Sequence, residues 1–396
     1  MVTFLPFSGY RPSLRPGENI EDRVSPPYDV ISPEQLKELQ AKSNNITNLT
    51  LAPDADKHYT HARQTLERMV KDGSLKQDTP SFYLYEQHFT DAGKQYRRLG
   101  LVGILKTEDY SAGNIIPHEE TFSKVKADRL NLLRDMETHL ESIFGIFTSF
   151  TPELKKKIDG AARLVYRYID PQQVEHRYYR IADPDLCGEI TAALKDQKML
   201  IADGHHRYET ALNYAKENPD CEAKQYVLAT LVASNDPGLV VWPTHRLVDA
   251  GDIGEKSAIS KLEKSLTMKE ISTAELETEL PQHMLGLMFR TGRCFVADPI
   301  APSDNIMMQL DTYVTQQVIL NGVYKADEGK STVSYDAELG PVKEAMAAKK
   351  HDLAVVLNPP SIKTIWDLAG AGKRMPKKTT FFFPKIWSGW VIYRMA

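Results

Sequence analysis

Five consecutive residues near the middle of the sequence combine a flexible position with groups that bind anions: Asp203, Gly204, His205, His206 and Arg207. The apolar run before them predicts a short buried strand, and apolar residues recur after them at helical spacing. The first N–H groups of a helix lack partners within the helix, and the helix dipole is positive there. We therefore expect a strand, a turn and a helix that together bind an anion.

The residue types in this turn suit phosphate. Gly204 allows a positive φ or a close approach of the backbone to a ligand. His205, His206 and Arg207 can donate hydrogen bonds to phosphate oxygens, and the guanidinium does so as a planar fork. His206 is also a candidate for proton transfer.

Two carboxylates flank the turn. Asp203 precedes Gly204 and Glu209 follows Arg207, and either could orient the bases or hold Mg²⁺ beside phosphates. In the alternative interpretation Gly204 is an ordinary turn residue, Asp203 caps the helix and the histidines are surface residues. The strand, turn and helix pattern favours the functional interpretation.

A second cluster of charged residues precedes and opens another predicted helix: His118, Glu119, Glu120, Lys124, Lys126, Asp128 and Arg129. Glu119 is the first candidate for a general base, and Lys126 and Arg129 are candidates for neutralising phosphate charge. Alternatively the segment is a solvated helix entry whose charges pair along the helix, for example Asp128 with Lys124.

Two shorter motifs are candidates for the acceptor side of a site. A double proline before Tyr28 and Asp29 fixes an extended backbone, which could hold Tyr28 at a substrate and Asp29 as a second candidate base. Thr244, His245 and Arg246 stand at one end of an apolar strand, where polar side chains fit a site. The alternatives are a stiff turn with a packed tyrosine and a strand that emerges into solvent.

A fifth motif covers residues 374–385, with the sequence RMPKKTTFFFPK. Lys377, Lys378, Thr379 and Thr380 could contact a phosphate, and Lys378 is our candidate on the substrate side. The aromatic run that follows predicts a core strand.

Composition restricts the class of protein. The 396 residues are 42% hydrophobic and 26% charged with a net charge of −4, which fits a globular protein and gives no basic field for nucleic acid. The cysteines are scattered, which predicts a reducing cytoplasm: Cys187, Cys221 and Cys294. We find no signal-peptide pattern and no apolar stretch long enough for a membrane helix.

The pattern of elements predicts an α+β (mixed α/β) fold with two domains, 1–249 carrying the phosphate site and 250–396 forming a smaller α/β part. Ser32 and Pro33 predict a helix start, and a turn at 91–93 predicts a hairpin. Residues 126–144 predict one long helix. The phosphate-binding loops of P-loop, dinucleotide-binding and protein-kinase folds are absent from the sequence.

Five segments together resemble the successive signatures of domain-of-unknown-function family 1015: PPYDVIS, PHEETFSKVKADRLNLLR, ADGHHRYETAL, NDPGLVVWPTHRLV and MPKKTTFFFPK. They occur in the family's order along nearly the whole chain, although the family's common form of the last motif has Ser-Thr where this chain has Thr379-Thr380. The segment DGHHR also resembles the phosphate-binding motif of the ParB/sulfiredoxin superfamily. That superfamily includes partition proteins, sulfiredoxins and free-serine kinases.

The second resemblance implies that Gly204, His206 and Arg207 line nucleotide phosphates. Sulfiredoxins carry their catalytic cysteine where this chain has His205, and partition proteins add a basic DNA-binding domain, so the kinase branch fits best. We therefore predict a phosphotransferase that uses ATP or ADP with Mg²⁺ on a small hydroxylated metabolite, with free L-serine first, and without nucleic-acid or membrane partners. A homodimer is compatible with the sequence. The alternatives are a regulatory nucleotide-binding protein without turnover and a phosphatase.

Overall fold

The computed structural model describes residues 1–52, 58–119, 123–278, 280–299 and 305–395, of which 58, 123–126, 277 and 278 are described by their backbone only. The chain forms two compact units. Unit 1 comprises Met1–Pro117, Thr121–Val240 and Pro384–Ala396, and unit 2 comprises His118–Glu120 and Val241–Phe383. The last thirteen residues thus belong to unit 1. Two domains divided at a single boundary between residues 249 and 250 do not include this return of the chain. The domain prediction from sequence stays a prediction.

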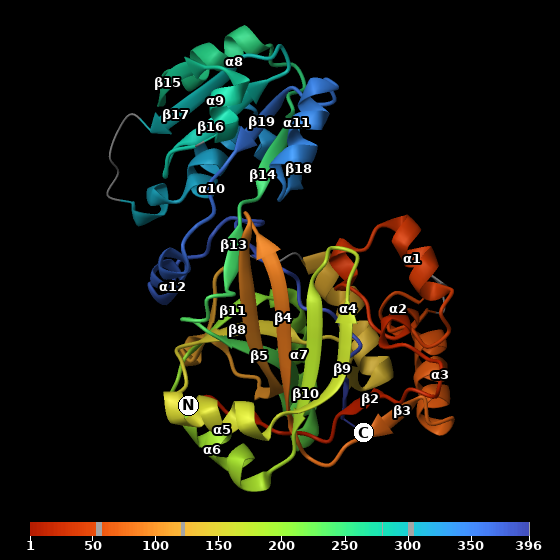
Figure 1. Cartoon of the computed structure of the whole chain (residues 1–396). Coiled ribbons are helices and arrows are strands. Elements are labelled where there is room, and N and C mark those ends of the chain that lie inside the picture. Colours follow the sequence, from red (N-terminus) through yellow and green to blue (C-terminus); the bar gives the residue numbers. More distant parts are fainter. Residues whose placement is uncertain (53–57, 120–122, 279, 300–304, 396) are drawn as a thin grey trace. The chain divides into compact units, whose positions relative to one another are not determined.

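Unit 1 is built on a mixed sheet, in which the described residues form nine strands in the order β6-β11-β8-β12-β5-β4-β10-β9, with β1 beside β5 (Figure 1). The pairs β6–β11 and β8–β12 are parallel, and the other described neighbours are antiparallel. The strands are β1 (Phe4–Leu5), β4 (Phe82–Asp91), β5 (Lys94–Lys106), β6 (Ile115–Pro117), β8 (Ile143–Phe147), β9 (Arg163–Ile169), β10 (Glu175–Ile181), β11 (Met199–Asp203) and β12 (Tyr226–Ala233).

Helices and two short ribbons complete unit 1 in its described part. The helices are α1 (Pro33–Gln40), α2 (Thr47–Thr50), α3 (His58–Lys71), α4 (Ser123–Met136), α5 (Pro152–Ala161), α6 (Pro184–Leu194) and α7 (His205–Glu217). The ribbons pair β2 (Tyr10–Pro12) with β3 (Leu75–Gln77) and β7 (Thr138–His139) with β21 (Tyr393–Arg394). Helix α4 packs against both α3 and α7.

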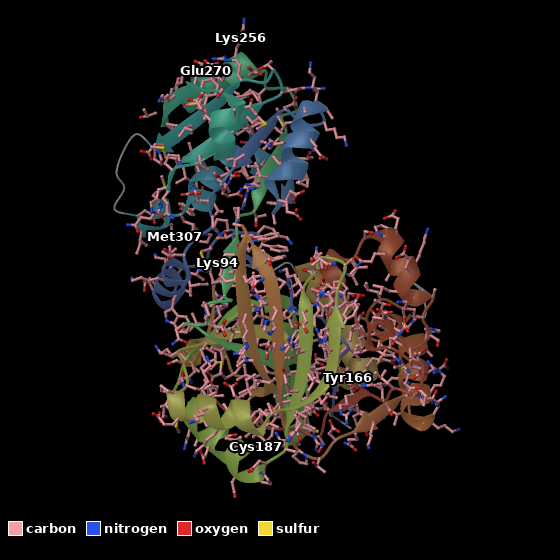
Figure 2. The ribbon with its side chains drawn as sticks, viewed as in Figure 1. Lys94, Tyr166, Cys187, Lys256, Glu270 and Met307 are labelled. Atoms are coloured by element: carbon pink, nitrogen blue, oxygen red, sulfur yellow. The ribbon has the colours of Figure 1, made fainter. Side chains whose placement is uncertain are left out.

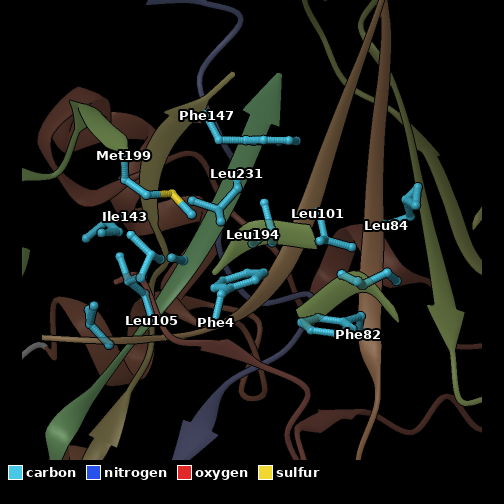
Figure 3. Close-up of a cluster of buried hydrophobic side chains, with 14 of the residues drawn as sticks. Phe4, Phe82, Leu84, Leu101, Leu105, Ile143, Phe147, Leu194, Met199 and Leu231 are labelled. Carbon is cyan, nitrogen blue, oxygen red and sulfur yellow. The ribbon is translucent and has the colours of Figure 1, made fainter. Parts of the chain in front are cut away.

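The two faces of the unit 1 sheet carry separate cores, because successive side chains of a strand point to opposite faces. On β4, Phe82 and Leu84 belong to one buried cluster, whereas Tyr83 and Tyr85 belong to the other. Figure 3 shows the first cluster, in which the rings of Phe4 and Phe82 stack with centroids 5.4 Å apart. The sheet whose strand β11 leads into α7 is therefore held rigidly by buried apolar contacts on both faces.

Unit 2 contains an antiparallel sheet of six described strands in the order β15-β17-β16-β19-β14-β18. These strands are β14 (His245–Asp249), β15 (Leu266–Ile271), β16 (Leu285–Phe289), β17 (Cys294–Pro299), β18 (Thr332–Asp336) and β19 (Leu353–Val356). A separate ribbon pairs β13 (Val240–Trp242) with β20 (Phe381–Phe383). On β14, Val248 faces one core cluster and Leu247 faces the other.

Helices pack on both faces of the unit 2 sheet. They are α8 (Glu255–Leu262), α9 (Thr273–Thr278), α10 (Asp311–Val314), the π-helix η6 (Thr315–Val323) and α11 (Leu339–Ala347). Unit 2 also contains α12 (Ile362–Gly370). Helices α8 and η6 share the cluster that contains Val248. Lys256 on α8 and Glu270 on β15 are exposed, and their side chains project from the unit in Figure 2.

The α+β fold class is confirmed, and so are several local predictions. Helix α1 begins at Pro33, with the Ser32 hydroxyl accepting from the Gln35 N–H at 3.2 Å, and residues 91–93 join β4 to β5. The prediction of one helix over 126–144 is wrong beyond Met136. Glu137 has a left-handed φ of 46°, and the residues after it pair with distant strands in β7 and β8.

Within the described residues, no helix is both long and apolar enough to cross a bilayer.

Candidate functional site

The predicted strand, turn and helix are present in unit 1. Strand β11 ends at Asp203, and α7 begins at His205 after Gly204. Gly204 has φ 86° and ψ 28°, a left-handed conformation that residues with a Cβ adopt only at a cost. No side chain caps the helix at this position, and Asp203 Oδ1 instead accepts from the Gly204 N–H at 2.7 Å. The alternative in which Asp203 caps α7 is therefore not what the structure contains.

The side chain of Arg207 folds back over this turn. A Cβ built on Gly204 would lie only 3.0 to 3.1 Å from Nη2, Cζ and Nε of Arg207, so the guanidinium lies directly against the glycine. Its Nη1 donates to the carbonyl of Ser142, which precedes β8. The turn thus needs glycine twice, for its φ and for the space that the guanidinium occupies.

Negative charges surround Arg207 within unit 1. Burial alone would lower the pKa of Arg207, but Glu141, Asp203, Tyr28 and Asp29 raise it above its ordinary value. The guanidinium is therefore charged at any physiological pH. Its position at the start of α7 places a fixed cation at the helix end that already favours anions.

Lys385 supplies a second cation to the same turn. Its Nζ donates to Asp203 Oδ2 at 2.8 Å, and the Asp203 side chain is 27% exposed. Burial raises the pKa of Asp203, but the charges of Lys385 and Arg207 outweigh it and hold the pKa below its ordinary value. Lys385 is the last residue of the fifth motif, whose predicted phosphate contacts are Lys377, Lys378, Thr379 and Thr380; the sequence predicts no role for Lys385.

A small cavity adjoins Arg207 in unit 1. It has a volume of about 50 Å³ and is lined by Thr50, Arg129, Leu132, Leu133, Thr138, His139, Leu140, Glu141, Arg207 and Thr210. The Arg129 guanidinium lies 4.7 Å from the centre of the Tyr28 ring and donates to Asp128 and to the carbonyl of Thr50. Arg129, Tyr28 and Arg207, predicted from separate motifs, therefore meet around one cavity or its edge.

Glu141 is a site residue that the sequence did not reveal. Its side chain is 8% exposed, and Oε1 accepts from the Tyr28 N–H at 3.3 Å and from Ser388 Oγ at 3.1 Å. It fell inside the stretch interpreted as helix, where a lone glutamate carries no signal. The carboxylate ties the double-proline segment to the neighbourhood of Arg207.

The remaining predicted residues of unit 1 differ in exposure. Asp29 is exposed in the short 3₁₀ helix Tyr28–Val30, and His205 is buried at the start of α7. His206 in the first turn of α7 and Glu209 just after it are half-buried. Lys126 falls in α4, but its side chain lies outside the described residues. No group of three or more His, Cys, Asp or Glu side chains suited to a metal occurs in the described part of the chain.

In unit 2, Glu119 holds the turn of the fifth motif. Its Oε1 accepts from the backbone N–H groups of Thr379 and Thr380 and from Thr380 Oγ1, each at 3.1 Å. The buried His118 ring bonds the same Thr380 hydroxyl at 2.9 Å through Nε2. Lys378, the residue before Thr379, is exposed with a left-handed φ of 59°. Glu120 lies outside the described residues.

Thr244, His245 and Arg246 also belong to unit 2, and all three are buried. His245 and Arg246 begin β14, so the alternative of a strand that emerges into solvent is wrong here. His245 Nδ1 accepts from the Leu357 N–H at 3.1 Å. Burial, with the charge of Arg246, lowers the pKa of His245 to about 4 although Asp336 opposes the shift, so the ring is neutral at pH 7.

The five motifs therefore sort into two groups. The glycine turn, the double proline, Arg129 and Lys385 come together in unit 1, whereas Glu119, Thr244 to Arg246 and the 378–380 turn come together in unit 2.

A family model matches residues 4–313, and it is described as "Protein of unknown function (DUF1015)". The match covers well over half of the chain. The chain belongs to the DUF1015 family. The membership predicted from the five motifs is therefore confirmed.

Solved structures resemble this DUF1015 protein at low identity. A mutant free serine kinase in complex with AMP gives a TM-score of 0.41 and 14% identity, covering 68% of this chain and 83% of that chain. A conserved hypothetical protein from Pyrococcus furiosus gives 0.38 and 14%, covering 69% and 89%. C-terminally truncated SbnI from Staphylococcus aureus gives 0.39 and 10%, covering 72% and 84%. No curated protein matches the chain. Likeness at these TM-scores carries no inference about activity.

Proposed function

We propose that this DUF1015 protein is a nucleotide-dependent phosphotransferase that acts on a small hydroxylated metabolite, with free L-serine as the first acceptor to test. The observation that carries the proposal is the guanidinium of Arg207 against Gly204 at the start of α7. A helix N-terminus, a left-handed glycine and a fixed arginine form a cradle for phosphate oxygens.

The donors of Arg207 support phosphate as the ligand. Among the described residues its hydrogen bonding is limited to Nη1, which donates to Ser142. Nε and Nη2, the two nitrogens beside Gly204, make no hydrogen bond to a described residue. These two donors form the side of the guanidinium that binds two oxygens of one phosphate. Lys385 adds a further positive charge at the turn.

The predicted metal role of Asp203 fits this site poorly. Its two oxygens already accept from Gly204 and Lys385, so Mg²⁺ would have to bind a remaining lone pair beside the Lys385 ammonium, whose positive charge opposes a cation. Glu209, the fifth residue of α7, stays a candidate. Mg²⁺ would more readily arrive with the nucleotide phosphates and keep most of its waters, and no step of the proposal depends on a bond from Asp203 to the metal.

Glu119 stays the candidate general base, and Asp29 the second. A base must take the proton of the acceptor hydroxyl as the phosphoryl group is transferred. Oε1 of Glu119 is occupied by the 379–380 turn, so the proposal assigns proton transfer to Oε2. Three hydrogen bonds to Oε1 hold the carboxylate in one orientation, which is what a base needs.

Calorimetric titration with AMP, ADP and ATP tests the nucleotide site. We expect binding by the wild type and at least a hundredfold weaker binding by Arg207→Ala. Arg134→Ala is the matched control, because Arg134 is an exposed arginine that pairs with Glu217 at the far end of α7. Equal binding by wild type and Arg207→Ala would remove the proposal.

Turnover then separates the alternatives. Formation of phosphoserine from L-serine supports the kinase. Tight nucleotide binding without product, and without response to Glu119→Gln, favours a regulatory protein that binds nucleotide. Release of phosphate from a phosphorylated acid in the absence of nucleotide favours a phosphatase.

A further inference from the structure

Arg246 in unit 2 is a buried cation without a counter-ion among the described residues. Its side chain is 1% exposed on β14. Nη1 donates to the carbonyl of Thr244, Nη2 lies 3.5 Å from the carbonyl of Lys377, and the guanidinium lies 5.3 Å from the centre of the Tyr335 ring. No ion pair joins it to a carboxylate in the part of the chain that the structure describes. A buried arginine in a folded protein normally has such a partner.

Two donors at this position also lack partners. Nε of Arg246 and Oγ1 of Thr244 are both buried and make no hydrogen bond with the described residues. Thr244 is 6% exposed, and the contact from Arg246 Nη1 to its carbonyl brings the guanidinium back beside it. A buried polar atom without a partner costs free energy in the order of 1–3 kcal/mol, so two together indicate a group that is missing.

The charge of the site selects an anion. Burial lowers the pKa of Arg246 to about 10, even though Tyr335 and Glu119 act to raise it. The guanidinium is therefore still protonated at pH 7, with a net positive charge to satisfy. Glu119 is the one described carboxylate that acts on it, and that carboxylate is already bound to the Thr379–Thr380 turn.

We propose that Arg246 and Thr244 bind the carboxylate of the acceptor substrate. Arg246 Nε donates to one carboxylate oxygen and Thr244 Oγ1 donates to the other. This inference rests on the proposed function, because it narrows the acceptor to small hydroxy acids and hydroxy amino acids. The same carboxylate site would lie on the unit that carries Glu119, the candidate base. Recognition of a carboxylate excludes amino alcohols and sugars as acceptor substrates, because they have no negative group to neutralise Arg246.

The probes are L-serine, D-glycerate and L-lactate, with ethanolamine as the analogue that lacks a carboxylate. Binding is measured by calorimetry on the full-length protein without nucleotide. We expect at least one of the three carboxylates to bind, and ethanolamine to bind at least tenfold more weakly. If none of the carboxylates binds, or if inorganic phosphate binds in their place, the proposal is overturned.

Thr244→Val separates binding from folding. Since Oγ1 has no partner in the described residues, the isosteric change removes no hydrogen bond from the free protein, and the melting temperature should be equal or higher. Carboxylate affinity should nevertheless fall at least fivefold. Arg246→Lys should weaken it tenfold or more, because the lysine side chain has no donor at the position of Nε and its ammonium would have to leave the carbonyls of Thr244 and Lys377 to reach the carboxylate. Unchanged affinity in Thr244→Val contradicts the assignment.

Two controls separate this inference from the proposed function. Arg293→Gln removes an exposed arginine of the same unit that pairs with Glu270. It should change neither the affinity for ADP nor the affinity for the carboxylate. Arg207→Ala should weaken the binding of ADP and leave the affinity for the carboxylate unchanged. Thr244→Val should weaken the binding of the carboxylate and leave the affinity for ADP unchanged. If the wild type binds a carboxylate but not ADP, the nucleotide site alone is refuted. If the wild type binds ADP but none of the carboxylates, the acceptor site alone is refuted.

Discussion

Lys385 and Asp203 are 182 residues apart in sequence, yet the Lys385 ammonium lies 2.8 Å from the Asp203 carboxylate. The chain leaves unit 1 after Val240 and returns at Pro384, and the next residue, Lys385, reaches the glycine turn. Lys385, at the end of the fifth motif, thus completes the surroundings of the glycine turn at Asp203 and Gly204. This pairing explains why a lysine far from the turn belongs to the candidate site.

Replacing Lys385 with methionine should destabilise the protein in a pH-dependent way. Asp203 has a lowered pKa in the folded state, so its ion pair adds stability above the pKa of an unfolded aspartate and loses it as the pH falls. At pH 7 we expect Lys385→Met to cost about 1–2 kcal/mol of unfolding free energy. Urea unfolding of the wild type and of Lys385→Met at pH 7 and at pH 3 measures this difference in unfolding free energy. A difference from wild type that does not shrink at pH 3 would contradict the pairing.

Gly204→Ala should damage both the fold of the turn and the binding of nucleotide. The φ of 86° disfavours any Cβ, and the new methyl group would press on Arg207 at 3.0 Å. We expect a loss of about 1–3 kcal/mol in unfolding free energy and at least tenfold weaker ADP binding. Gly160→Ala is the control, because a Cβ at this α5 position meets nothing within 4 Å. Wild-type behaviour of Gly204→Ala would show that the turn tolerates other conformations.

Glu119→Gln should abolish turnover without disturbing the fold. The amide oxygen of glutamine can still accept from the Thr379 and Thr380 N–H groups, so the turn remains in place. The amide cannot take a proton, so a phosphotransfer assay should show at least a hundredfold loss of kcat with unchanged affinity for ADP. If kcat is retained, Asp29→Asn is the next variant, and Glu119 has a structural role alone.

His245 should make stability depend on pH between 6.5 and 4. The unfolded histidine takes up its proton near pH 6.5, but the folded ring does so only near pH 4, so stability is full above pH 6.5 and falls toward pH 4. The loss is about 3 kcal/mol at most, since each unit of pKa corresponds to roughly 1.4 kcal/mol. His245→Gln should flatten the unfolding free energy in this range. A slope equal to that of the wild type would exclude His245 as its source.

The sequence predicted the local parts of this molecule better than its long-range pairings. The glycine turn was predictable because strand, turn and helix are adjacent and each has its own periodicity. The strand content of residues 138–147 was not, since β7 pairs with residues about 255 positions later in the chain and β8 with residues 86 positions later. In the same way Lys385 and Glu141 gave no local signal, and their role depends on contacts with Asp203 and Tyr28.

The grouping of the motifs was likewise beyond the sequence. Glu119 and Arg129 stand in one motif only ten residues apart, but Glu119 belongs to unit 2 and Arg129 to unit 1. Spacing along the chain gives no information on such a division, because it depends on which strand or turn each side chain meets in the fold.

A crystal structure of the wild-type protein with ADP shows directly whether the turn at Gly204 binds phosphate. We expect a phosphate of ADP to lie within hydrogen-bond distance of the first N–H groups of α7 and of Arg207 Nε and Nη2. Occupied ADP density elsewhere in the molecule, with the guanidinium of Arg207 still against an empty Gly204 turn, would contradict it.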